Sequence, residues 1–341
     1  MMNTKNYNSI DVAKLFMAVC VVAIHTDPLY GCAGGFGLDL FEQVISWAVP
    51  FFFICTGFLI GKHIDLTGDH AAKQIKTSAL KMLKLYLLWS VIYLPPAIVE
   101  RLHAGKSVAY NLLHYAKGLI LNGEHYNSWI LWYLLSSFYA LLFISFLVKR
   151  KQSPGRILAI GCVLFVSYLA LNALCDYANM LPPGLQKLLP LIQSTVGRGK
   201  PLQGFLYIPI GLCLSGKCMR VPQAAILFVV PFVLSFFTGQ AVDRVLLPIT
   251  VTGFFGLIVS IPLPDGKVYL ILRKYSTGIY FIHLYCWMFY YLVFCGQKTY
   301  GLVAFLVTTL LSVILTTLWL IASRQIHRHK SKQISTCLLY T

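Results

Sequence analysis

The chain has 341 residues, of which 58% are hydrophobic and only 11% charged. Soluble domains carry about 25% charged residues, so this composition excludes a soluble globular domain, a disordered chain and a charged coiled coil. The formal net charge is +17. Its Lys and Arg residues gather in alternate loops, which indicates a polytopic membrane protein and not a nucleic-acid-binding protein.

A helix needs about 20 apolar residues to cross the hydrocarbon core of a membrane. Runs of this kind predict an all-α membrane bundle of about ten transmembrane helices. With both termini on the cytoplasmic side, most basic residues fall in cytoplasmic stretches, as the positive-inside rule requires. The predicted spans are residues 9–28, 41–61, 79–99, 128–148, 157–175, 202–216, 222–239, 244–262, 276–295 and 301–322.

Three segments depart from a simple spanning helix. Residues 106–122 form an amphipathic segment that is predicted to lie on the membrane surface. The span 202–216 is short and contains proline and glycine, which predicts a kinked or re-entrant helix. Residues 323–341 are polar and basic, so we expect a membrane domain over 1–322 followed by a cytoplasmic tail or linker.

The first span contains three ionisable residues, Asp11, Lys14 and His25. Such residues are costly inside a membrane and often functional. Lys14 and His25 are eleven residues apart, which puts them on one helix face roughly 16 Å apart along the axis. Structural roles are also open: Lys14 can extend to the headgroups, His25 lies near the outer end, and Asp11 can pair with Lys14.

A second intramembrane histidine, His283, lies in the ninth span, seven residues after Ser276 and three after Tyr280. A neutral histidine bonded to a neighbouring helix is the structural interpretation. The functional interpretation is that His283 orients a substrate or tunes His25. The aromatic residues Trp132 and Tyr133 begin another span, where an interfacial belt is expected in any case. No Cys/His spacing typical of a metal site is present, so no metal is expected.

Four segments, in chain order, resemble the motifs of the acyltransferase-3 family of ten-span membrane acyltransferases. The first is the acidic, basic and histidine pattern of Asp11, Lys14 and His25, in which the family has Arg where this chain has Lys. The others are FFICTGF at 52–58, LWYL at 131–134 and the stretch from Ser276 to His283. Ile130 stands where the family often has histidine before the LWYL element.

Within that family, the segments VVAIHTDPL, VPFFFICTG and LKLYLLW are most similar to the membrane domain of vancomycin-resistance serine racemases, as is Arg198 ahead of FLYIP. Those proteins continue into a soluble pyridoxal-phosphate domain. These 341 residues have no counterpart of that domain, so no racemisation is expected of them.

The resemblance implies an enzyme of the bacterial cytoplasmic membrane that transfers an acyl group from acyl-CoA, with acetyl-CoA as the first candidate, to a hydroxyl-bearing acceptor. His25 would be the general base, and Lys14 would meet the CoA phosphates or the thioester oxygen. Five further residues are implied on the substrate side: His283, Tyr280, Arg198, Trp132 and Tyr133.

A second hypothesis is a membrane module that binds or carries an amino acid such as L-serine. Lys14 and His25 would then line a polar pathway, and Arg198 and Lys200 would meet the substrate carboxylate. Asp176 or Glu124 would meet its amino group. A third hypothesis is a catalytically silent anchor for a partner protein.

Overall fold

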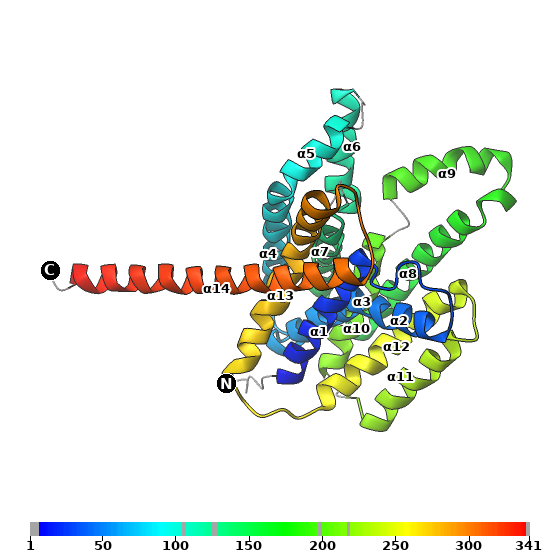
Figure 1. Cartoon of the computed structure of the whole chain (residues 1–341). Coiled ribbons are helices and arrows are strands. Elements are labelled where there is room, and N and C mark those ends of the chain that lie inside the picture. Colours follow the sequence, from blue (N-terminus) through cyan, green and yellow to red (C-terminus); the bar gives the residue numbers. More distant parts are fainter. Residues whose placement is uncertain (1–6, 104–106, 125–127, 197–199, 217–218, 339–341) are drawn as a thin grey trace. The chain divides into compact units, whose positions relative to one another are not determined.

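The computed structural model describes residues 7–103, 107–124, 128–196, 200–216 and 219–338, and every regular element in these ranges is helical (Figure 1). The α-helices are α1 (Asn8–Thr26), α2 (Phe36–Ser46), α3 (Ala48–His63), α4 (Ala71–Ile92), α5 (Leu94–His103), α6 (Val108–Lys117), α7 (Trp132–Lys149), α8 (Pro154–Asp176), α9 (Pro183–Val196), α10 (Gly204–Gly216), α11 (Val221–Ser235), α12 (Gln240–Ser260), α13 (Lys267–Tyr290) and α14 (Leu302–Leu338). Short 3-10 segments are Trp129–Leu131, Ala178–Met180 and Lys200–Gln203, and π-helical turns are Gly118–Asn122 and Tyr291–Cys295.

Seven helical segments among the described residues are long and apolar enough to cross a membrane. They are α1, α2 with α3, α7 with the 3-10 turn before it, α8, α12, α13 with the π-turn after it, and the first two thirds of α14. The helix α11 is apolar but shorter. Each of the ten predicted spans overlaps a helix, so the all-α membrane bundle is confirmed, whereas the number of crossings and their orientation stay predictions.

Helix α8 shows how local sequence sets a helix boundary. Ser153 caps it, because its side-chain oxygen accepts a hydrogen bond from the backbone N–H of Arg156. Pro154 occupies the first helical position, where its missing N–H costs nothing. The apolar residues that follow continue the helix to Asp176.

The predicted spans differ from the helices mainly at their ends. The span 41–61 covers two helices, which meet at the buried Trp47; its indole packs against Phe228, Phe232 and Phe254. The helix predicted to begin at Ser276 begins at Lys267. The last helix continues through the predicted tail to Leu338, so the described part of that tail is helical.

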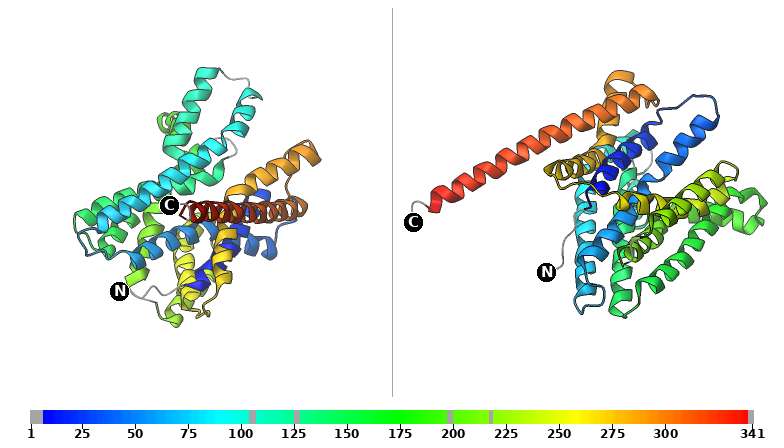
Figure 2. Two further views of the ribbon diagram at one scale, coloured as in Figure 1. Left: turned by 90° about the vertical axis from the view of Figure 1, so that its left-hand side faces the viewer. Right: turned by 90° about the horizontal axis from the view of Figure 1, so that it is seen from below.

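The chain forms two compact units. The first unit comprises residues 1–10 and 46–263, and the second comprises residues 11–45 and 264–341. In the first unit α3 packs against α10, α4 against α7, α8 against α10, and α11 runs beside α12 (Figure 2). In the second unit α13 packs against α14.

The contact between α3 and α10 depends on two glycines. A Cβ atom on Gly57 would overlap the carbonyl oxygen of Ile208, and one on Gly211 would overlap that of Ile54. The two backbones therefore touch directly, an approach that only glycine permits. This contact holds the FFICTGF segment of α3 in place.

The face of α14 that is buried in the second unit carries hydroxyl side chains. Thr308, Ser312 and Thr316 recur every four residues and are at most 2% exposed. Ser312 donates its hydroxyl to the carbonyl of Thr308. Thr316 lies against Gly278 of α13, so this stripe of small residues packs on the helix that carries His283.

Candidate functional site

A bidentate ion pair joins α1 to α13 in the second unit. The Nε and Nη2 atoms of Arg273 donate to the two carboxylate oxygens of Asp11 over 2.8 and 2.7 Å. The Asp11 side chain is 3% exposed, whereas that of Arg273 is 51% exposed. Two parallel charge-assisted bonds hold such a pair in one geometry. The partner of Asp11 is therefore Arg273 of α13 and not Lys14, so the predicted pairing of Asp11 with Lys14 is wrong.

Lys14 lies one turn further along α1. Its backbone carbonyl accepts a 2.9 Å hydrogen bond from the hydroxyl of Ser276 on α13. Its own side chain is partly exposed and makes no ion pair with a residue that the structure describes in the second unit. The lysine ammonium is thus presented on a helix whose backbone is fixed by Ser276.

His25, near the end of α1, lies beside His283 of α13. The centres of the two imidazole rings are 5.3 Å apart, and the ring planes are tilted by 31°. His25 is partly exposed, and His283 is completely buried. The two histidines of the predicted spans are therefore neighbours.

The hydrogen bonds of His283 define its tautomer. Its Nδ1 lies 3.0 Å from the carbonyl oxygen of Ile279, which can only accept, so Nδ1 carries the hydrogen. Its Nε2 is then an acceptor, and this atom is buried with no hydrogen-bond partner among the described residues. Tyr280, also buried, has its ring centre 6.5 Å from that of His283.

Tyr133 and the FFICTGF segment come together in the first unit. The Tyr133 hydroxyl donates to the hydroxyl oxygen of Thr56 over 3.0 Å and lies 3.3 Å from the carbonyl oxygen of Phe52. Thr56 also donates to that carbonyl. The hydroxyl of FFICTGF thus bonds to the tyrosine of LWYL, and this joins two of the motifs that carry the resemblance.

Aromatic rings surround this polar contact. The ring of Phe53 lies 4.6 Å from that of Tyr133, 5.8 Å from that of Trp132 and 6.3 Å from that of Tyr207, with which it is nearly parallel. Trp132 and Tyr133 are both partly exposed. The two aromatic site candidates therefore lie together in the first unit.

The remaining polar candidates belong to the amino-acid hypothesis. Arg198 lies outside the described residues. Lys200 forms a 2.6 Å ion pair with Glu124, and Arg244 forms one of 2.5 Å with Asp176. Both acidic residues are thus already neutralised by basic residues of the same unit.

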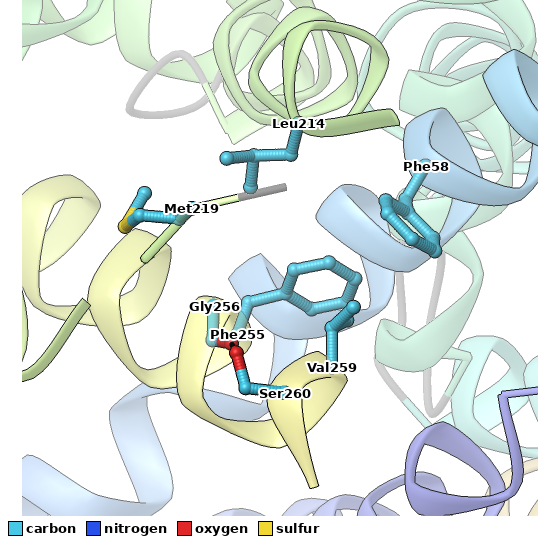
Figure 3. A pocket seen from close by; sticks show the side chains of 7 residues that line it. All are labelled: Phe58, Leu214, Met219, Phe255, Gly256, Val259 and Ser260. Atoms are coloured by element: carbon cyan, nitrogen blue, oxygen red, sulfur yellow. Dashed lines mark hydrogen bonds between the residues drawn. The ribbon is translucent and has the colours of Figure 1, made fainter. Parts of the chain in front are cut away.

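A cavity of about 270 Å³ opens between α3, α10 and α12 of the first unit. Figure 3 shows its lining, which is apolar except for one hydroxyl: Phe58, Leu214, Met219, Phe255, Gly256, Val259 and Ser260. That hydroxyl, on Ser260, donates to the carbonyl of Gly256. This lining contains no acid or base that could activate the Ser260 hydroxyl, so we do not place the chemistry in this cavity.

Sequence reasoning missed two residues of the site. Arg273 reads as one of many basic residues near a predicted span end, and Ser276 as the first letter of a motif. Their roles depend on which carbonyl or carboxylate of α1 they meet, and α1 lies 262 positions earlier in the chain.

Comparison with known proteins identifies the family. The acyltransferase-3 model, described as an acyltransferase domain, matches residues 7–322. The chain belongs to the acyltransferase-3 family. It is an integral membrane protein of that family, as the ordered motifs and the helical bundle indicate.

Curated relatives include an amino-acid racemase of Enterococcus faecalis, 28% identical over 217 residues, which are 63% of this chain and 30% of the relative. A serine/alanine racemase of Enterococcus gallinarum is 28% identical over 156 residues, which are 46% of this chain and 22% of the relative. The acyltransferase-3 chain thus matches less than a third of either relative's length. No solved structure is significantly similar to it.

Proposed function

We propose that this acyltransferase-3 chain transfers an acyl group, with acetyl as the first candidate, from acyl-CoA to the hydroxyl of an acceptor molecule, with His25 as the general base. The observation that carries the proposal is the position of His25. It is partly exposed on α1, on the predicted face of Lys14 and beside the buried His283. A neutral imidazole has a suitable pKa for base catalysis near pH 7.

The reaction that we assign to His25 balances as follows. The acceptor O–H bond breaks as its proton passes to a ring nitrogen of His25, and the oxygen forms a bond to the thioester carbonyl carbon. The carbon–sulfur bond then breaks. The CoA sulfur leaves with the proton that His25 returns, so the products are an acyl ester and free CoA, and His25 is regenerated.

Lys14 takes the phosphate end of the donor in this proposal. Eleven residues of α-helix separate it from His25, or roughly 16 Å along the axis. Its ammonium cannot reach a thioester that reacts at His25, so of its two expected roles we favour contact with the CoA phosphates. Lysine serves as a point charge for phosphate where arginine offers a two-pronged fork.

The second candidate function is binding or uptake of serine, and the similarity to the serine/alanine racemase of Enterococcus gallinarum favours it. In that case Lys200 or Arg198 would take the carboxylate and Glu124 or Asp176 the ammonium group. The ion pairs of Glu124 and Asp176 count against this arrangement, since each must open before the carboxylate can bind a new cation.

Thermal unfolding of the detergent-purified protein separates the two functions. A ligand at 100 times its Kd stabilises a protein by about 2.7 kcal/mol, which shifts the midpoint measurably. We expect acetyl-CoA and CoA to raise the midpoint of the wild type, and Lys14→Ala to abolish that shift while Lys14→Arg keeps it. A shift with L-serine and none with CoA compounds would replace the acyltransferase proposal by the amino-acid one.

A further inference from the structure

The cavity between α3, α10 and α12 combines two buried rings with four partly exposed side chains (Figure 3). The rings of Phe58 and Phe255 are each 1% exposed and pack edge to face, with their centres 5.2 Å apart. The partly exposed side chains of the wall are those of Leu214, Met219, Val259 and Ser260. A hollow with such a wall is suited to an apolar group that enters from outside the protein.

The cavity lies where three helices end. Helix α3 ends at His63, α10 at Gly216 and α12 at Ser260, and the wall residues lie in or just after the last two turns of these helices. Helix α12 is long and apolar enough to cross a membrane. The last turns of a spanning helix reach from the hydrocarbon core to the headgroups. The apolar group that the cavity meets at this depth is therefore the acyl chain of a lipid.

Two basic residues flank the cavity. The ammonium of Lys62 lies 5.5 Å from the centre of the Phe58 ring and 5.8 Å from that of the Tyr7 ring, so it is held beside the cavity wall. Arg220 is exposed and follows Met219 of the wall. Neither side chain forms an ion pair within the described part of the chain. Basic residues at the membrane surface attract anionic headgroups.

We infer that this cavity binds one acyl chain of an anionic phospholipid, whose phosphate meets Lys62 and Arg220. The inference goes beyond the proposed function and requires no acyl transfer. A free phosphate would leave the apolar wall unused, and a lipid with a neutral headgroup would leave the two cations unused. A long-chain acyl-CoA also has a chain and a charge, but the residues that we assign to the donor, Lys14 and His25, belong to the other unit.

The charge of the headgroup is tested with two lipids that have the same chains. Native mass spectrometry of the detergent-purified chain measures the apparent Kd of the first bound lipid. We expect dioleoyl phosphatidylglycerol to bind more tightly than dioleoyl phosphatidylcholine, and Lys62→Gln to reduce this preference about fivefold. Lys149→Gln is the matched control, because Lys149 is an exposed lysine at the end of α7 that does not line the cavity.

The cavity itself is tested by filling it. Val259→Phe puts a larger side chain into the wall, and we expect it to weaken the binding of phosphatidylglycerol at least about tenfold, since exclusion of two methylene groups already has this effect. Ile258→Phe is the matched control, because Ile258 is the neighbouring residue of α12 and does not line the cavity. If Val259→Phe does not fold, Ser260→Leu replaces it.

Three results would overturn the inference. The first is an equal Kd for the two lipids in the wild type, and the second is unchanged binding of phosphatidylglycerol in the filled variant. The third is tighter binding of oleoyl-CoA than of phosphatidylglycerol, lost in the filled variant, which would assign the cavity to the acyl donor. Absence of acyl transfer would refute the proposed function alone, because lipid binding is measured without it.

A photoreactive lipid locates the bound chain. Phosphatidylglycerol with a diazirine in one acyl chain is cross-linked to the wild type, and peptide mass spectrometry identifies the modified residues. We expect the label on the last turns of α12 or α10, and less of it when unlabelled phosphatidylglycerol is added in excess. Label confined to other helices would contradict a chain in this cavity.

Discussion

The carboxylate of Asp11 is almost fully buried, and the guanidinium that neutralises it comes from a helix 262 positions later. Removing one partner of a buried pair leaves an uncompensated charge, which costs more than the pair itself contributes. Because half of the Arg273 side chain is exposed, water screens part of this cost. We therefore expect Arg273→Gln to lower the free energy of unfolding by about 2 kcal/mol, measured by thermal or denaturant unfolding in detergent.

The double variant Asp11→Asn with Arg273→Gln is the control for this prediction. It removes the unpaired charge together with its partner, so it should recover much of the stability that Arg273→Gln loses. Equal stabilities of the single and the double variant would show that Asp11 does not depend on Arg273.

Tyr133 offers a test of the aromatic candidates. Tyr133→Phe removes the hydroxyl that meets Thr56 and Phe52, and we expect a loss of about 1 kcal/mol in stability. If Tyr133 contacts substrate, KM or kcat for acyl transfer also worsens. Tyr139→Phe is the matched control on the same helix, because its hydroxyl likewise donates to a carbonyl. Equal acyl-transfer activity in both variants would show that the Tyr133 hydroxyl does not contact substrate.

At the residue scale, the sequence predicts which ionisable residues belong to the candidate site better than it predicts which residues they contact. His25 and His283 stand out because ionisable groups are rare within apolar runs. The contact between their rings depends on how α1 and α13 face each other. The helical period predicts which residues share a face of one helix, but not which helix packs against that face. The pairing of Asp11 with Lys14 was a local expectation. The arginine that binds Asp11 comes from the other end of the chain.

At the scale of helices, alanine substitutions of three glycines distinguish a contact with backbone atoms from a contact with a side chain. Gly57→Ala drives a methyl group into the carbonyl of Ile208, which cannot move without α10, so we expect a loss of about 3 kcal/mol in stability. Gly278→Ala meets only the side chain of Thr316, which can rotate, so the loss should be about 1 kcal/mol.

Gly155 is the matched control for this series. It lies near the start of α8 with no atom within 4 Å of an added Cβ. Gly155→Ala should therefore be neutral or slightly stabilising, since alanine favours helix. Unfolding midpoints that rank the three variants in another order would contradict the direct backbone contact between α3 and α10.

The helices were predictable from the sequence because a sufficiently long run of apolar residues indicates a membrane-spanning helix. Their ends were less predictable. The break at Trp47 is marked in the sequence only by Pro50, in the first turn of α3, and its indole is fixed by rings of α11 and α12 that are far away in sequence. The π-turn at Tyr291–Cys295 ends at Gly296 in the left-handed region, at φ 69°, a position that favours glycine but gave no signal of π geometry.

At the scale of the whole chain, the predicted orientation rests on the distribution of basic residues. An exposed cysteine, Cys32, lies in the loop between α1 and α2, which this orientation puts on the outer side of the membrane. We expect a membrane-impermeant maleimide to label Cys32 in intact cells, with Cys32→Ser as the blank. Labelling only after permeabilisation would show that Cys32 lies on the cytoplasmic side and that the predicted orientation is wrong.

The composition predicts a membrane bundle, but it does not predict that the first two helices associate with the end of the chain and not with the helices that follow them. Residues 11–45 form a compact unit with residues 264–341, and the chain between them forms the other unit. Each of the four motifs falls within one of these units: the first and last in the second unit, and FFICTGF and LWYL in the first. A linear pattern of apolar runs cannot encode which runs associate.

The most direct test of the central claim is acyl transfer by the purified protein in vesicles supplied with acetyl-CoA labelled in its acetyl group and with envelope extract as the source of acceptor. The account predicts that free CoA and an alkali-labile labelled ester form in equal amounts, and that His25→Ala abolishes both while its unfolding midpoint stays near that of the wild type. Labelled ester formed at the wild-type rate by His25→Ala would contradict the assignment of the base. Serine accumulation in the same vesicles without any ester would contradict the acyltransferase function itself.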